Sequence, residues 1–96
     1  MTADTTLHHL ETLATWLRAH PDATVISATV EGREHPVLHL SEAYFRGHFA
    51  GEVVRTSRHG QSIRFELNRD GICFISFAPQ EETLQAVLTT KTVEKS

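Results

Sequence analysis

The feature that most constrains the fold is a run of apolar residues at helical spacing near the N-terminus. These residues recur at steps of three and four, which places them on one face of an amphipathic helix over residues 5–20: Leu7, Leu10, Leu13, Ala14 and Leu17. Asp4, Thr5 or Thr6 can cap the start of this helix, and Pro21 disfavours helical backbone at the residue before it. We therefore predict a long N-terminal helix whose leucine stripe packs on the rest of the domain.

A hairpin and a short second helix are predicted next. Residues 23–31 alternate in polarity as a half-buried strand does, and residues 35–40 are again extended after a glycine-containing turn. Ser41 is a good N-cap for a helix of about two turns. In that helix Phe45 and Phe49 are four residues apart and would share the buried face.

Three more extended segments follow, at residues 52–57, 62–67 and 72–77. The turns between them contain glycine, which is typical of antiparallel neighbours. The last of the three is apolar on both faces, which predicts a central position or a covered outer face. Residues 80–90 fit either a helix that begins at Pro79 or a final strand, and their alternation slightly favours the strand.

The element order therefore predicts an α+β fold for the whole chain. A chain of 96 residues holds one small hydrophobic core, so residues 1–96 are expected to form a single domain. The N-terminal helix would pack on an antiparallel sheet of about five strands, accompanied by the short second helix. Residues 1–4 and 91–96 are expected to fray.

Composition excludes several classes of protein. Cys73 is the single cysteine, so neither a disulfide framework nor a cysteine-based zinc cluster can form, and a cytoplasmic location is expected. Its apolar neighbours indicate an inert thiol in the core. No basic leader is present, and no apolar run approaches the roughly 18 residues that cross a bilayer. We therefore expect neither export nor a membrane span.

No motif in the chain indicates catalysis. The sequence has no Gly-x-Ser-x-Gly elbow, no Walker loop and no Gly-x-Gly-x-x-Gly, and its serines and histidines are not arranged with an acid as a triad. We accordingly predict no catalytic residues, no cofactor and no enzymatic activity.

Seven histidines raise the question of a metal site. His35 and His39 are four apart, but in a strand this spacing spans about 13 Å, too far for one ion. His8 and His9 are adjacent on the helix and diverge by about 100°. A site that combines His39 with a histidine of the second helix, His48, stays open. The overall expectation is that no metal is bound.

The net charge of −3 is unevenly distributed along the chain. Residues 1–31 carry four acids and one arginine, whereas residues 32–69 carry six arginines and four glutamates. Four arginines of the second half could form one positive edge that contacts phosphates: Arg55, Arg58, Arg64 and Arg69. The overall acidity and the lack of aromatic residues beside them make nucleic-acid binding the weaker interpretation. The alternative is a solvated sheet face with ion pairs to Glu52 and Glu66.

Residues 41–49 place three aromatic rings in six positions, more than one face of a two-turn helix can bury. Either Tyr44 contacts a partner or it covers the edge of the core. Trp16, off the leucine stripe, either widens the buried face or is left for a partner. Aromatic and arginine side chains dominate interfaces, and together with the acids of the first half they give six candidate partner-binding residues: Glu11, Trp16, Asp22, Glu31, Tyr44 and Arg46.

We therefore hypothesise a non-enzymatic domain that binds another protein. A more specific version is an inhibitor of the kind carried by phages and mobile elements, for example an anti-CRISPR-like blocker, which occludes a positively charged surface with its acids and aromatic anchors. One alternative is nucleic-acid binding through the four arginines. Another is a homodimer in which residues 72–77 or an edge strand pair across a two-fold axis.

Overall fold

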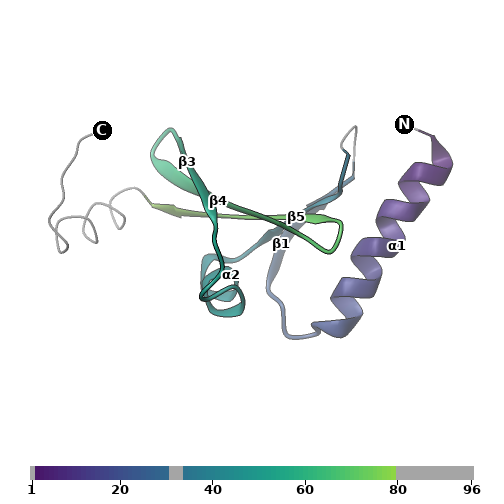
Figure 1. Cartoon of the computed structure of the whole chain (residues 1–96), viewed down its shortest axis with the longest axis horizontal. Helices are drawn as coiled ribbons and strands as arrows, with labels where there is room; N and C mark the ends of the chain where they lie inside the picture. Colours follow the sequence, from purple (N-terminus) through teal and green to yellow (C-terminus); the bar gives the residue numbers. More distant parts are fainter. Residues whose placement is uncertain (1, 31–33, 80–96) are drawn as a thin grey trace, which may run out of the picture.

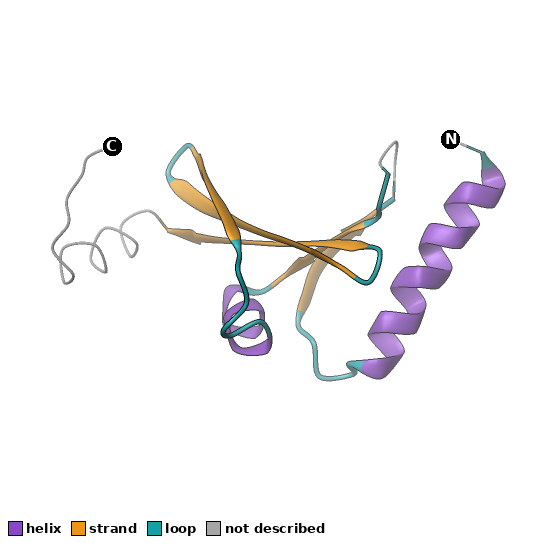
Figure 2. Ribbon diagram, viewed as in Figure 1, coloured by secondary structure: helices purple, strands orange, loops and turns teal. Residues whose placement is uncertain are grey.

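A computed structural model describes residues 2–30 and 34–79 and shows two helices and a five-stranded sheet (Figures 1 and 2). In chain order the elements are α1 (Ala3–Ala19), β1 (Val25–Thr29), β2 (Val37–Leu40), α2 (Glu42–His48), β3 (Arg55–His59), β4 (Ser62–Arg69) and β5 (Ile72–Pro79). This order confirms the predicted α+β fold. The predictions for residues 80–90 and 91–96 lie outside the described residues. None of the described helices is long and apolar enough to span a bilayer.

The sheet has the strand order β1-β2-β5-β4-β3 and is mixed. Its pairs are antiparallel except for β2 and β5, which run parallel with Leu38 opposite Phe74. The expectation of a wholly antiparallel sheet is therefore wrong at this pair. The reason is the chain path, because α2 and the β3–β4 hairpin carry the chain away and return it beside β2 in the same direction. Strand β5, which is apolar on both faces, is central, which was one of the two predicted alternatives.

Both helices pack on one face of the sheet. Strands β2 and β5 supply the floor of the core with alternate residues, α1 contributes two large side chains, and α2 and its C-cap residue contribute one each. The cluster consists of Leu38, Leu40, Ile72 and Phe74 from the sheet, Leu13 and Trp16 from α1, and Phe45 and Phe49. The Ser76 hydroxyl, buried on the same face, donates a hydrogen bond to the carbonyl oxygen of Leu40 at 2.9 Å.

The leucine stripe of α1 faces the core only in part, through Leu13 and Leu17. The buried side chains of this helix are His9, Leu13 and Trp16, whereas Leu7 and Leu10 are 56% and 48% exposed. Trp16 determines this rotation, because its ring packs on Phe74 with centroids 4.9 Å apart. The expected cap is also wrong, since the helix begins earlier and the hydroxyl oxygen of Thr2 accepts the hydrogen bond from the amide of Thr5.

Strand β1 is shorter and more exposed than predicted. Four of its five residues are exposed, although their alternation predicted a half-buried strand. The core residues of the sheet come from β2 and β5, so β1 extends beyond the area that the helices cover. The cap of α2, by contrast, agrees with the sequence, because the Ser41 hydroxyl accepts a hydrogen bond from the Tyr44 amide at 3.2 Å.

Candidate functional site

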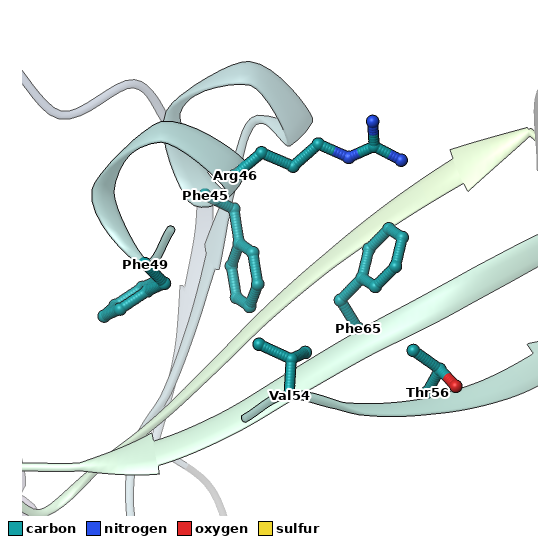
Figure 3. Close-up of a pocket in the computed structure, with 6 residues that line it drawn as sticks. All are labelled: Phe45, Arg46, Phe49, Val54, Thr56 and Phe65. Atoms are coloured by element: carbon teal, nitrogen blue, oxygen red, sulfur yellow. The ribbon is translucent and has the colours of Figure 1, made fainter. Parts of the chain in front are cut away.

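A pocket of about 210 Å³ lies between α2 and the β3–β4 hairpin (Figure 3). The rings of Phe45 and Phe65 point toward one another across it, with centroids 6.1 Å apart. The Ser41 cap sets the start of α2 and so directs Phe45 toward the sheet, and Gly51, at φ +87°, turns the chain back after the helix. The complete lining is Phe45, Arg46, Phe49, Val54, Thr56 and Phe65.

Two guanidinium groups lie against rings that line this apolar pocket. Arg46 lies over the ring of Phe65, 5.5 Å from its centroid, and its Nε is 3.2 Å from a carboxylate oxygen of Glu42. Arg69 lies 5.9 Å from the centroid of Phe49 and pairs with Glu52. Arg58 shares the pocket's face of the sheet, because it alternates along β3 with the lining residue Thr56.

The predicted positive edge is divided between the two faces of the sheet. Arg58 and Arg69 lie on the helix-covered face, whereas Arg55 and Arg64 lie on the other, which we call the open face. On the open face Arg55 is opposite Glu66 in the ladder, and Arg64 pairs with the same glutamate at 3.6 Å. The ion pairs expected from the alternative interpretation, to Glu52 and Glu66, are both present.

Aromatic and histidine rings lie beside the arginines of the open face, which the sequence reasoning missed. The Phe77 ring contacts His39 and His59, with centroids 5.2 and 5.9 Å apart. Arg64 is opposite Phe77 in the ladder of β4 and β5. The register of β5 is the signal that places Phe77 here, because residues of one strand alternate between faces.

The predicted combination of His39 with His48 is excluded by the same alternation. His39 lies on the open face, where burial lowers its pKa, whereas α2, which carries His48, packs on the opposite face. Cys73 also lies on the open face and outside the core cluster, so the prediction of a core thiol is wrong. Its Sγ donates to a carboxylate oxygen of Glu66 at 3.5 Å.

His48 instead joins His20 where α1 ends beside α2. The two imidazole rings meet edge to face with centroids 4.9 Å apart, and His20 stacks on Trp16 at 4.0 Å. Tyr44 stacks on His48 at 5.3 Å, and its pKa is raised by burial and by the nearby Asp22 carboxylate. Three of the six predicted partner-binding residues, Trp16, Asp22 and Tyr44, are therefore brought together.

Trp16 widens the buried face of α1, since it is only 7% exposed. Trp16 also lines a second hollow of about 410 Å³ beside the turn between β4 and β5. The other residues that line it are Thr12, Thr15, Ala19, His20 and Asp70. Of the other predicted partner-binding residues, Glu11 is exposed on α1 and Arg46 is at the pocket, while Glu31 is outside the described residues.

Within residues 2–30 and 34–79, no group of three or more histidine, cysteine or carboxylate side chains is placed to hold a metal ion. In comparisons with known proteins, no family model matches the chain, and no similar curated protein or solved structure was found. The pocket, its arginines and the open face are therefore the observations from which a function has to be inferred.

Proposed function

We propose that this chain is a non-enzymatic protein-binding module and that the pocket beside α2 receives one apolar side chain of its partner. The observation that carries this proposal is an apolar pocket whose aromatic lining is contacted by two guanidinium groups, those of Arg46 and Arg69. Sites for small molecules usually measure roughly 300–1,000 Å³. A pocket of about 210 Å³ is smaller than these, and it suits a single leucine or aromatic anchor.

The charge around the pocket selects an anchor that is flanked by aspartate or glutamate. Arg46 and Arg69 each have one intramolecular carboxylate partner, and no ion pair involves Arg58 among the residues that the structure describes. Guanidinium groups that border an apolar pocket strengthen binding through both charge and ring stacking. An acidic segment of a partner protein therefore complements this surface better than a basic one.

A module of this kind acts by occupying a surface, which is how an inhibitor works. The more specific proposal is a cytoplasmic inhibitor of the phage or mobile-element kind, for example an anti-CRISPR-like blocker. In that version Glu11 and Asp22, exposed on α1 and just after it, face a basic region of the partner while the pocket holds the anchor. The arginines and these acids would give the complex a defined orientation.

Peptides with a central phenylalanine test the pocket directly. The peptide flanked by glutamates should bind at low salt and shift the amide resonances of Val54, Thr56 and Phe65, and the lysine-flanked version should not. Arg46→Glu is expected to weaken binding about fivefold to tenfold, because it reverses one charge at the rim. Arg55→Glu is the matched control on the open face and should have no effect. Equal binding of both peptides, or shifts confined to other residues, would contradict the proposal.

Nucleic-acid binding by the open face is a second candidate function. It is favoured by Phe77 between two histidine rings, next to Arg64, whose Nε is buried with no hydrogen-bond partner among the described residues. Bases stack on such rings, and arginines contact the phosphates. A single-stranded oligonucleotide should shift in a gel at low salt and lose affinity as salt rises.

Phe77→Ala should weaken that binding at least about fivefold. Arg58→Gln, on the other face, should leave it unchanged. The absence of a shift at low ionic strength would exclude this second function.

A further inference from the structure

Among the residues that the structure describes, strand β1 is an edge of the sheet that carries no protective residue. It has the sequence Val-Ile-Ser-Ala-Thr, with no charge and no proline, and Val25 and Ile26 are 40% and 59% exposed. Its ladder with β2 is irregular between Val25 and Ser27, and from Ser27 to Thr29 it is regular. Exposed edges usually carry charged residues or proline, because their unpaired amide and carbonyl groups can pair with another chain. The regular part of β1 lacks both forms of protection.

The opposite edge of the same sheet is protected. Strand β3 carries two arginines and one histidine in five residues, Arg55, Arg58 and His59. Two copies of β3 side by side would bring like charges together, which disfavours pairing. The contrast between the edges indicates that pairing is prevented at β3 and permitted at β1.

Leu10 lies on the flank of α1 opposite Thr12, whereas Leu7 points away from the sheet. Thr12 packs beside Gly71 in the turn between β4 and β5, so its flank of the helix faces away from β1. At about 100° per residue, Leu10 projects about 160° from Thr12, and Leu7 projects about 150° from the mean direction of the buried side chains of the helix. Figure 1 shows α1 and the β1–β2 hairpin at one end of the molecule and β3 at the other.

Most of the exposed large apolar side chains belong to α1 and β1. Among the described residues, five large apolar side chains are exposed, and four of them belong to α1 or β1: Leu7, Leu10, Val25 and Ile26. The fifth, Val53, precedes a residue that lines the pocket. Within the described part of the chain, β1 therefore combines a free backbone edge with two exposed apolar side chains, Val25 and Ile26.

We infer that a second copy of the chain covers this end, with β1 of one protomer antiparallel to β1 of the other about a two-fold axis. A two-fold pair requires a strand that is compatible with itself, and an uncharged strand places no like charges opposite one another. The axis would continue the helix-covered face across both protomers, so the Leu10 flanks of the two α1 helices would approach each other over the paired strands. Strand β5 has a neighbour on each side and is excluded as the pairing strand.

Light scattering of the full chain over a hundredfold range of concentration tests this inference. At high concentration the mass should be that of two 10.8 kDa chains. Ser27→Lys, in the middle of β1, should raise the dissociation constant about tenfold or more, because two ammonium groups would meet near the axis. Ser57→Lys is the matched control, as it changes an exposed serine in the middle of β3 and should leave the dimer intact.

Leu10→Lys is a second test that leaves the sequence of β1 unchanged. This variant should also weaken the dimer, while its circular dichroism spectrum stays that of the wild type. If the wild type has the mass of one chain at the highest concentration, the inference is wrong. Strand β1 would then be an edge that could pair only with a different protein. A dimer that Ser57→Lys dissociates and Ser27→Lys does not would overturn it as well. The pocket beside α2 lies away from the axis, so peptide binding there tests the proposed function separately.

Discussion

His9 is a polar side chain in an apolar position. It is 5% exposed, and no described residue forms a hydrogen bond with its Nδ1. A buried nitrogen without a partner costs about 1–3 kcal/mol. We therefore expect His9→Leu to raise the free energy of unfolding by about 1 kcal/mol, measured by urea titration. His8→Leu, at the exposed neighbouring position, should change it little. A loss of stability in His9→Leu would show that the imidazole has a partner in solution.

His39 should make the stability of the fold depend on pH. Burial lowers the pKa of His39 in the folded chain, whereas its pKa in the unfolded chain is about 6.5. Above that pH both states are neutral at this residue. As the pH falls below it, the unfolded state binds the proton first, so the folded state loses stability. The free energy of unfolding should fall more steeply from neutral to mildly acidic pH in the wild type than in His39→Gln. Equal slopes would contradict this assignment.

At the scale of the element, α2 depends on its cap because it has only seven residues. Ser41→Ala removes the hydrogen bond to the Tyr44 amide and should lower the free energy of unfolding by about 1 kcal/mol. It should also speed amide exchange in α2 and weaken peptide binding at the pocket. Thr2→Ala removes the corresponding cap of α1 and is the control, since it should leave exchange in α2 unchanged. If both variants changed amide exchange in α2 equally, the Ser41 cap would not be what keeps α2 and the pocket in place.

The sequence predicted which elements form, and it predicted less well how they pack. Spacing of leucines identifies residues that share a helix face, but Trp16, on the adjoining face, has the larger ring and determines which face docks. The parallel pairing of β2 with β5 was missed because strand alternation carries no information about neighbours distant in the chain. The apolar residues on both faces of β5 predicted either a central position or a covered outer face, and the central position is the one observed.

The candidate site was predicted only in part for a related reason. Arg46 was identified from its residue type and its aromatic neighbours. The pocket beside it needs Phe65 and Val54, which are brought to α2 by the β3–β4 hairpin. The open face likewise needs His39, His59 and Phe77 from three different strands. Such clusters are consequences of strand order, which a single sequence does not specify.

At the scale of the whole molecule, a dimer through β1 would make thermal stability depend on concentration. A partner that binds only the folded state raises the melting temperature by mass action. The midpoint of the wild type should therefore rise across a hundredfold increase in concentration, measured by scanning calorimetry. Because its dimer is weaker, Ser27→Lys should show a smaller rise over the same range of concentration. A wild-type midpoint that stays constant would be inconsistent with the paired edge.

The central place of β5 also has a consequence for how the chain acquires its fold during synthesis. The β1–β2 hairpin and the β3–β4 hairpin each contact the rest of the sheet only through β5, the last of the described strands. Isolated two-stranded hairpins are marginally stable in water. As the chain leaves the ribosome, the two hairpins therefore cannot join into one sheet before residues 72–79 have emerged.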